Sequence, residues 1–257
     1  MKPQGTQRGA KNLSERFARS EALLGEAAMA RLKEARVLVV GVGGVGSWCA
    51  EALVRTGVGK ITLVDDDVVA ESNVNRQCPA TTETIGRAKV EAMAERLRAI
   101  NPGCEVRASC SRFSRGSSVE GFDAVVDAID SVDCKAELIL KATEAGVPLV
   151  SSMGAALRTD PTKVKVTRFE KVEGDGLAKA LRQRFRKMAR WPKGRFSCVW
   201  SGEPPVGKGP RSICCTSGRE TASPFWAGKG SLMQVTAVFG MCLASETIKI
   251  LTKGEAK

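Results

Sequence analysis

The chain of 257 residues contains no histidine and no tyrosine. Histidine is the usual general base near neutral pH and the commonest metal ligand in proteins. Its absence excludes Ser-His triads and His-ligated metal centres. Any catalysis therefore has to use carboxylates, lysine, arginine, cysteine or backbone groups.

Closely paired cysteines are also missing. The nine cysteines, at positions 49, 78, 104, 110, 134, 198, 214, 215 and 242, form no CxxC pair. This spacing argues against a zinc ribbon and against a redox-active dithiol. Because their number is odd and the chain can bury a sizeable core, we expect reduced thiols in an intracellular protein. Cys198 and the Cys214–Cys215 pair leave sulfur transfer with a cysteine-desulfurase or sulfur-acceptor partner open, although small buried thiols are the commoner case.

Long apolar runs are absent. The longest uncharged stretch, Gly230 to Ser245, has 16 residues, whereas a membrane-spanning helix needs about 20 predominantly apolar residues. The sequence therefore favours a buried helix over 231–252 and no obligatory membrane insertion. The first 13 residues are basic and lack the apolar core of a secretory signal. We expect a flexible basic arm there and a cytoplasmic protein, with organellar targeting and peripheral membrane attachment left open.

Acidic residues are few relative to basic ones. The 28 Asp and Glu stand against 40 Lys and Arg, a formal net charge of +12. Such an excess favours a polyanionic partner through counterion release and long-range steering, and a basic but merely solvated surface is the alternative. The segment from Lys179 to Arg195 has eight cations and no acid. The candidate nucleic-acid-binding residues of this segment (177–195) are Lys179, Arg182, Arg186, Lys187 and Arg190.

Strand and helix patterns alternate regularly from residue 36 to residue 152. Short runs typical of strands occur at 36–40, 60–64, 104–110, 122–130 and 147–152, with helical patterns from Gly46 to Thr56, at 89–100 and at 133–144. This alternation predicts βαβ units and a Rossmann-like, doubly wound, mostly parallel α/β sheet with helices on both faces. We assign 14–152 to the Rossmann-like core and 153–257 to a C-terminal part of the same domain, with strands at 163–169 and 195–200.

A glycine-rich turn joins the first predicted strand to the first predicted helix. Residues 41–46 read GVGGVG and satisfy GxGxxG through Gly41, Gly43 and Gly46, with Gly44 as a fourth glycine in the turn. Glycines allow a tight turn and the close approach of a phosphate to a helix N-terminus. The motif alone does not distinguish NAD from ATP. Glycines that only allow close packing of helix on strand are the structural alternative.

The residues that follow the second strand favour ATP. A polar cluster that dinucleotide binding does not need lies within 25 residues: Asp65, Asp67, Asn73, Arg76, Gln77 and Lys89. Arg76 and Lys89 are cations of the kind that neutralise a triphosphate and a pyrophosphate leaving group. Asp130 comes at the end of the fourth strand, where ligands bind in open α/β sheets. An ordinary loop or helix-capping aspartate is the alternative for Asp130.

In order along the chain, GVGGVGS, LVDDD, SNVNRQ, IGRAKVEAM and VVDAIDS resemble the ubiquitin-activating-enzyme-like (MoeB, ThiF and HesA) adenylyltransferase superfamily over residues 17–152. The resemblance implies ATP, Mg²⁺ and a carboxylate substrate that attacks the α-phosphate. It also implies that residues 41–46 line the phosphates and that Asp65 holds the ribose. The implied triphosphate ligands are Asn73, Arg76 and Lys89, supported by Gln77.

Two further roles follow from the same resemblance. Asp130 is implied to ligate the magnesium ion. Residues 16–32 resemble the family's N-terminal helix, whose arginine reaches the phosphates, often from a dimer partner; Arg16 is the candidate and Arg19 competes with it. The candidate catalytic residues are therefore Arg16, Arg76, Lys89 and Asp130.

Within the superfamily, the chain resembles the tRNA threonylcarbamoyladenosine dehydratases. The similarity rests on VVDAIDSVDCKAELI, VPLVSSMGAAL, DPTKVKVTRFEK, LAKALRQRFRK and FSCVWSGEPP, and extends over residues 14–252, with departures at Cys78 and at 217–230. It implies ATP-dependent cyclisation of threonylcarbamoyladenosine beside the anticodon, a tRNA partner and a homodimer. An adenylyltransferase acting on the C-terminus of a sulfur-carrier or ubiquitin-like protein is the alternative, and a nucleotide-gated adaptor without catalysis is a third.

Overall fold

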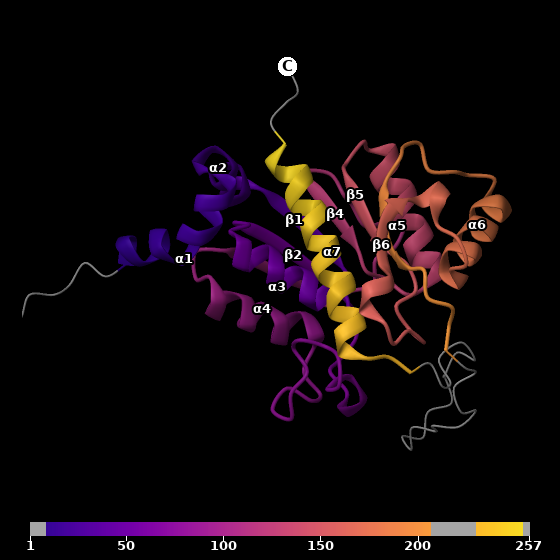
Figure 1. The fold of residues 1–257 in the computed structure, drawn as a ribbon, viewed down its shortest axis with the longest axis horizontal. Coiled ribbons are helices and arrows are strands. Elements are labelled where there is room, and N and C mark those ends of the chain that lie inside the picture. Colours follow the sequence, from indigo (N-terminus) through magenta and orange to yellow (C-terminus); the bar gives the residue numbers. More distant parts are fainter. Residues whose placement is uncertain (1–8, 207–229, 254–257) are drawn as a thin grey trace, which may run out of the picture.

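A seven-stranded sheet forms the centre of the computed structural model, which describes residues 9–206 and 230–253 (Figure 1). Its strand order is β3-β2-β1-β4-β5-β7-β6, and every neighbouring pair is parallel except the antiparallel pair β6 and β7. The predicted doubly wound, mostly parallel α/β fold is therefore confirmed, and the C-terminal part of the chain adds two strands to the same sheet.

The elements lie close to the predicted ranges. The strands are β1 (Arg36–Val40), β2 (Lys60–Val64), β3 (Glu105–Ser109), β4 (Ala124–Asp127), β5 (Leu149–Ser152), β6 (Val164–Arg168) and β7 (Ser197–Ser201). The helices are α1 (Gly9–Leu24), α2 (Glu26–Glu34), α3 (Gly46–Thr56), α4 (Lys89–Ile100), α5 (Val132–Glu144), α6 (Gly176–Met188) and α7 (Met233–Thr252), with 3-10 turns η1 (Glu71–Asn73), η2 (Pro161–Lys163) and η3 (Phe169–Lys171).

The N-terminal region differs from the expectation in two ways. Helix α1 begins at Gly9, inside the segment expected to be a flexible arm. The expected N-terminal helix over 16–32 is interrupted at Gly25, which has φ +81°. Only glycine adopts this left-handed conformation without strain, so Gly25 separates α1 from α2.

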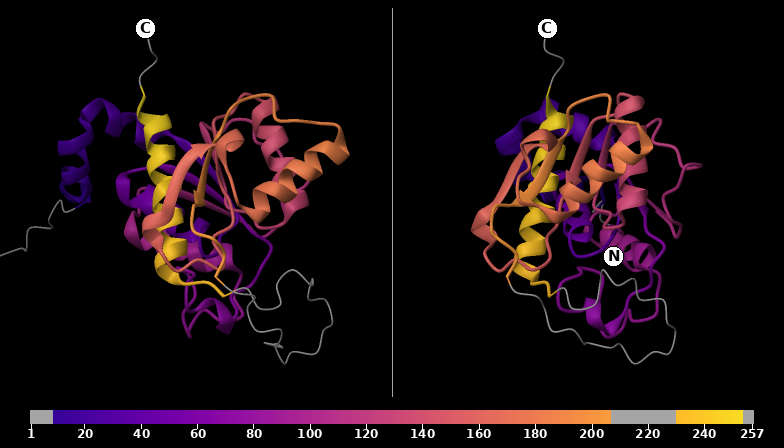
Figure 2. Two further views of the ribbon diagram at one scale, coloured as in Figure 1. Left: turned by 45° about the vertical axis from the view of Figure 1, so that its right-hand side comes forward. Right: turned by 90° about the vertical axis from the view of Figure 1, so that its right-hand side faces the viewer.

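The central strands are buried on both faces, as is typical of parallel sheets. In β1, Val37 and Val39 pack into the cluster formed with α3, α4 and α7, whereas Leu38 and Val40 pack into the cluster formed with α5 and α6. The two further views in Figure 2 show α7 on one side of the sheet and α5 with α6 on the other.

Helix α7 is long and apolar enough, by length and composition, to cross a membrane. In this structure it packs along α3, and its Val235, Phe239 and Leu243 side chains have no exposed surface. A Cβ atom at Gly240 would lie 2.6 Å from the carbonyl oxygen of Val45, so the glycine permits this close crossing. The buried helix predicted for 231–252 is what the fold contains.

An ion pair lies inside the core where β4 ends. The Nζ of Lys135 is 2.9 Å from Oδ2 of Asp127, and neither side chain has any exposed surface. The hydroxyl of Ser151 on β5 donates to the same carboxylate at 2.6 Å, and the backbone N–H of Ile129 donates at 3.1 Å. Lys135 also donates to the carbonyl oxygen of Ile129 at 2.9 Å. The pair therefore joins β4, β5 and α5, and it shapes the loop that follows β4.

We expect Lys135→Met to lower the free energy of unfolding by about 3–5 kcal/mol, because Asp127 would keep a buried charge without its cation. Chemical denaturation at neutral pH measures the change. The double variant Asp127→Asn/Lys135→Met removes both charges and should recover most of the loss. Wild-type stability in Lys135→Met alone would contradict this role.

Candidate functional site

Three loops that carry the sequence-predicted site residues meet at the carboxyl edge of the sheet. They follow β1 (residues 41–45), β2 (65–88) and β4 (128–131). Because β2, β1 and β4 are neighbours and parallel, these loops leave the sheet side by side, at the point where the chain reverses its direction across the sheet. This switch point is where open α/β sheets bind ligands.

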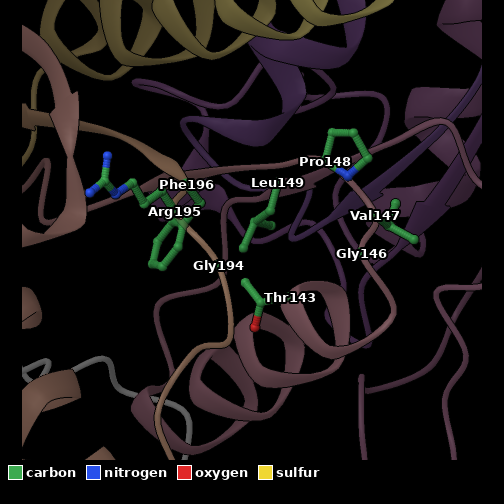
Figure 3. A pocket seen from close by; sticks show the side chains of 8 residues that line it. All are labelled: Thr143, Gly146, Val147, Pro148, Leu149, Gly194, Arg195 and Phe196. Carbon is green, nitrogen blue, oxygen red and sulfur yellow. The ribbon is translucent and has the colours of Figure 1, made fainter.

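A surface hollow lies at the opposite edge. Figure 3 shows it between the end of α5 and the segments that lead into β5 and β7, with Thr143, Pro148 and Phe196 among its lining residues. Because these segments precede their strands, the hollow is at the amino edge of the sheet. It contains none of the sequence-predicted site residues.

The four motif glycines divide into two kinds. A Cβ atom at Gly41, where φ is +91°, would lie 2.6 Å from the oxygen of Ala128, and one at Gly46 would lie 1.8 Å from the oxygen of Gly41. Close packing therefore requires both residues. At Gly43 the nearest atom would be 3.8 Å away, on Gln77, and at Gly44 it would be 3.3 Å away, on Arg76. Gly43 thus leaves room in front of the loop for a ligand, whereas Gly44 is already in close contact with the Arg76 side chain.

Asp65 ties the glycine loop to the end of β2. Its Oδ2 accepts the backbone N–H of Val42 at 2.6 Å, and its Oδ1 accepts that of Asp67 at 2.9 Å. Burial raises the pKa of the Asp65 carboxyl, while the charge of Lys89 and these two N–H groups oppose that shift. A carboxylate has about four acceptor positions, so Asp65 retains capacity for ligand hydroxyls.

Most of the other acidic side chains at this edge already form an ion pair with a lysine or arginine. The Asp67 carboxylate is 2.6 Å from Nζ of the buried Lys89, and the Asp66 carboxylate is 3.0 Å from Nε of Arg112. By contrast, the exposed Asp130 side chain makes no hydrogen bond or ion pair with the residues that the structure describes. Partial desolvation raises the pKa of its carboxyl, and the charge of Lys135 opposes this shift. Asp130 could therefore ligate a metal ion, as could Asp65, Asp66 and Asp67, whose carboxylate oxygens lie within 4.8 Å of one another.

The loop after β2 brings Asn73, Arg76 and Gln77 next to the glycines. The Asn73 Oδ1 accepts the backbone N–H of Ala70 at 3.1 Å, which closes the η1 turn. The Arg76 guanidinium donates to the oxygen of Ser72 at 2.8 Å and keeps further N–H groups for a ligand. Gln77 is buried, and in the described part of the chain its Oε1 has no hydrogen-bond partner. Buried polar atoms are normally satisfied, so this amide indicates a place for a bound group.

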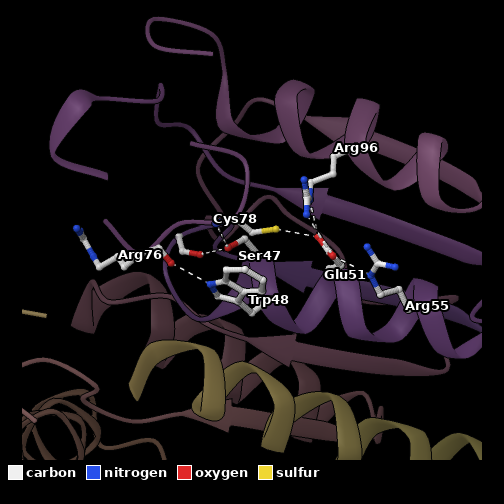
Figure 4. A network of polar contacts seen from close by, with 8 residues as sticks. Ser47, Trp48, Glu51, Arg55, Arg76, Cys78 and Arg96 are labelled. Atoms are coloured by element: carbon white, nitrogen blue, oxygen red, sulfur yellow. Dashed lines mark hydrogen bonds and ion pairs between the residues drawn. The ribbon is translucent and has the colours of Figure 1, made fainter. Parts of the chain in front are cut away.

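Helix α3 holds this loop in place, as Figure 4 shows. The indole N–H of Trp48 donates to the oxygen of Arg76 at 2.9 Å, and the hydroxyl of Ser47 accepts the backbone N–H of Cys78 at 3.2 Å. The Cys78 thiol in turn donates to the carboxylate of Glu51 at 2.8 Å. The loop is thus anchored by the same helix that the glycine motif begins.

Glu51 is the charged centre of this network. Its carboxylate is 2.5 Å from Nε of Arg96 on α4 and 2.8 Å from Nε of Arg55 on α3. Sequence reasoning missed Glu51 and Lys135. In both cases the only sequence signal is that a charged residue interrupts the apolar face of a helix, the face that points into the core.

Arg16 lies away from the site of its own chain. Its guanidinium donates to the oxygen of Ile100 at 2.7 Å, at the end of α4. Because α4 begins at Lys89 on the carboxyl edge, Arg16 is about a full helix length, roughly 18 Å, from Lys89. In this arrangement Arg16 reaches a nucleotide site only if that site belongs to another copy of the chain.

The predicted basic helix is α6, and its cations have different surroundings. Arg182 donates to the oxygens of Phe169 and Val172 at 2.9 and 2.7 Å, and Arg190 is 3.0 Å from the Glu144 carboxylate. These two side chains therefore already have partners. Lys179, Arg186 and Lys187 are exposed and make no ion pair with the described residues.

The remaining side chains of interest are aromatic residues of this segment and the thiols. Phe185 is fully buried, while Trp191 is 50% exposed. Cys198 is also buried, and burial raises the pKa of its thiol far above the usual range. Such a thiol is a poor nucleophile. Cys214 and Cys215 lie outside the described residues.

Comparisons with known proteins agree with this geometry. The ThiF family is matched over residues 17–257. The chain is 39% identical to the tRNA threonylcarbamoyladenosine dehydratase of Escherichia coli K12, over 91% of this chain and 92% of that protein. It is 41% identical to the enzyme of the same name from Bacillus subtilis, over 74% and 76% of the two chains. The solved structure of the E. coli enzyme, TcdA, in complex with ATP is similar with a TM-score of 0.82 and 37% identity, covering 94% of this chain and 96% of that one.

Glu51 should make stability depend on pH below neutrality. Burial alone would raise its pKa, but hydrogen bonds from Arg96, Cys78 and Arg55 outweigh burial and hold the pKa at about 2. A lowered pKa stabilises the folded state above the unfolded value of 4.5, and this contribution is lost as the pH falls toward 2. We expect Glu51→Gln to be less stable than wild type at pH 7, with the difference shrinking between pH 5 and pH 3.

Unfolding in guanidinium chloride at several pH values measures the difference in stability between Glu51→Gln and wild type. The matched control is Glu95→Gln, which removes an exposed carboxylate paired with Arg87; exposed pairs contribute little. A difference between Glu51→Gln and wild type that stays constant from pH 7 to pH 3 would refute the assignment.

Proposed function

The chain belongs to the ThiF family, and we propose that it is a tRNA threonylcarbamoyladenosine dehydratase, which uses ATP to close a ring in the modified adenosine beside the anticodon. The observation that carries the proposal is the match to the E. coli enzyme over nine-tenths of both chains. The complete set of charged and glycine residues at the carboxyl edge supports it, because that edge is suited to a bound triphosphate.

The charge of the carboxyl edge suits ATP. The solved E. coli TcdA structures include one in complex with ATP and one in complex with AMP. In this chain we place the phosphates before Gly43, where a Cβ atom would meet little, and at the N-terminus of α3. The ribose lies at Asp65. Arg76 and Lys89 neutralise the triphosphate, and Asn73 and Gln77 line the same loop.

Magnesium fits this site through the chemistry of Asp130. Mg²⁺ prefers carboxylate and phosphate oxygens and retains several waters, and Asp130 offers a carboxylate that has no partner among the described residues. When bound, the ion neutralises charge on the phosphate oxygens. Asp67 would remain the partner of Lys89.

The reaction begins with activation of the threonyl carboxylate. One of its oxygens forms a bond to the α-phosphorus, and the bond from that phosphorus to pyrophosphate breaks. Cationic side chains that are already fixed in position stabilise the charge that develops on the leaving group. This is the role of Lys89 and Arg76. Both are fixed by the protein, Lys89 by its ion pair and Arg76 by its loop.

Ring closure follows within the same nucleotide. The ureido nitrogen attacks the activated carbonyl carbon, its proton passes to solvent, and AMP departs with one oxygen of the original carboxylate. The base has then lost the elements of water. Because nucleophile and electrophile belong to one molecule, proximity supplies much of the rate. No catalytic cysteine is required, in keeping with the buried state of Cys198.

The partners follow from the same scheme. We propose that tRNA phosphates bind α6 through Lys179, Arg186 and Lys187, with Arg182 and Arg190 shaping that surface through their own contacts. A homodimer would allow Arg16 to reach the partner's nucleotide. The seven cysteines of the described residues are all free, which supports a location in the reducing cytoplasm.

A second function has one observation in its favour. The chain is 34% identical over 174 residues to the E. coli molybdopterin-synthase adenylyltransferase, covering 66% of each protein. An adenylyltransferase of this kind would activate the C-terminus of a sulfur-carrier or ubiquitin-like protein. The substrate that induces exchange of pyrophosphate into ATP distinguishes the two functions.

Incubation with ATP, magnesium and threonylcarbamoyl-modified tRNA should yield a nucleoside lighter by one water molecule, as measured by mass spectrometry after digestion. Asp130→Asn should slow this conversion by about a hundredfold or more, because the phosphates lose their ion. The matched control Asp133→Asn removes a carboxylate three residues further on, paired with Arg184, and should leave the rate near wild type. Unchanged nucleoside mass, with pyrophosphate exchange induced only by a carrier protein, would favour the second function.

The glycine loop offers a separate test of nucleotide binding. We expect Gly43→Ala to fold with nearly wild-type stability but to bind ATP more weakly, because its methyl group occupies the space before the loop. Gly46→Ala should instead destabilise the fold by several kcal/mol through its clash with Gly41. Thermal unfolding and equilibrium dialysis with ATP measure the two effects. Unaltered ATP affinity in Gly43→Ala would place the phosphates elsewhere.

A further inference from the structure

Positive charge is concentrated in one unit of the fold. Residues 163–195, which contain β6 and α6, hold twelve Lys and Arg against three Asp and Glu, a net +9 out of the formal +12 of the whole chain. The helix α6 accounts for only part of this excess. Four further cations precede it, in η2, β6 and η3: Lys163, Lys165, Arg168 and Lys171.

The cations of this unit also differ from the others in their partners. Between β1 and α5, arginines typically pair with acids, as Arg36 does with Asp123 and Arg87 with Glu95. By contrast, the side chains of Lys163, Arg168 and Lys171 are exposed and have no hydrogen bond or ion pair within 9–206 and 230–253. Unpaired cations are the ones that can release counterions when phosphates bind.

Strand β6 presents its charges at a free sheet edge. It is the last strand of the sheet and pairs only with β7. The Lys165 ammonium lies over the ring of Trp200 at 5.6 Å, and the Trp200 indole donates to the hydroxyl of Thr167 at 2.9 Å. Trp200 packs into the cluster formed with α5 and α6, so Lys165 is on the same face of the sheet as α6.

Direct contacts join β6 and α6 into one surface. The guanidinium of Arg182 lies 5.0 Å from the centre of the Phe169 ring and donates to the oxygens of Phe169 and Val172, just beyond β6. The right-hand panel of Figure 2 faces this edge and shows both elements toward the viewer. The two rows of cations therefore keep a fixed spacing.

Both elements also begin at the edge that holds the nucleotide site. Val164 pairs with Ser201, the last residue of β7, which places the start of β6 at the carboxyl edge. Asp175, which caps α6, accepts the backbone N–H of Gly154 just after β5. Lys163, Lys165 and Lys179 therefore lie toward the carboxyl edge, whereas Lys171, in the turn after the end of β6, and Arg186 lie toward the opposite edge.

We propose that the β6 edge and the η3 turn after it, through Lys163, Lys165 and Lys171, are a second row of phosphate contacts for tRNA beside α6. The inference rests on the proposed function. The cations at the carboxyl edge hold the backbone of nucleotides flanking the modified base, and those further along hold the adjoining stem. Phosphate contacts fix register without reading sequence, which is what a site that recognises a modified base requires.

The test compares two triple variants with equal loss of charge. Lys163→Gln/Lys165→Gln/Lys171→Gln neutralises the β6 edge and the turn that follows it, and Lys33→Gln/Arg107→Gln/Lys253→Gln neutralises three exposed cations elsewhere. We expect the first to weaken tRNA binding about tenfold or more and to reduce the slope of log K against log salt by about 2 to 3, since each lost phosphate contact removes roughly 0.7 to 0.9. The control should change binding less than about twofold.

ATP affinity and thermal unfolding are measured alongside, and neither should change. If the triple variant unfolds, Lys163→Gln/Lys171→Gln leaves Lys165 on Trp200 and should still reduce the slope by about two-thirds as much. Equal losses in both triple variants would overturn the inference in favour of net charge alone. If the triple variant binds tRNA as wild type does but begins to self-associate, the inference would also be wrong. The lysines would then serve to keep the free edge of β6 from pairing with another chain. Failure of the proposed function would give a different result, because the wild-type protein itself would then not cyclise the nucleoside.

Discussion

The buried pair of Asp127 and Lys135 is the interaction on which the site depends. It lies where the chain reverses its direction across the sheet, and it satisfies its charges through Ser151 and the backbone of Ile129. Two charges without solvent are tolerated only with this complete set of partners. The arrangement therefore fixes β4, β5 and α5 relative to one another, and with them the loop that carries Asp130.

A second buried group does the same for the other side of the site. Glu51 collects hydrogen bonds from two arginines and from the thiol of Cys78, while Trp48 and Ser47 of the same helix bind the adjacent backbone. The glycine loop and the loop of Arg76 and Gln77 are thus both anchored to α3. Residues that lie behind the candidate site therefore determine the distance between the residues proposed to bind the ligand.

Much of the fold could be predicted from the sequence because its signals are local. The β-branched runs, the period of α4 and the glycine turn each report on their own segment, and the strands and helices lie within a few residues of their predicted positions. The partners of Glu51 and Lys135 depend instead on which segments meet in the folded chain. The same reason explains α6, where charge alone could not separate Arg182 and Arg190, which bind other parts of the protein, from Lys179 and Arg186. The break at Gly25 depends on one backbone angle, and glycine by itself allows many.

The ion pair between Lys89 and Asp67 has a consequence for turnover in the proposed reaction. The lysine carries its own internal counter-ion at 2.6 Å, so an incoming anion has to compete with Asp67 for the ammonium. A triphosphate, with several negative charges, competes well, whereas the nucleoside monophosphate left at the end competes poorly. The carboxylate is thereby positioned to reclaim its lysine and to help expel the spent nucleotide, so that the site is reset without a separate conformational step.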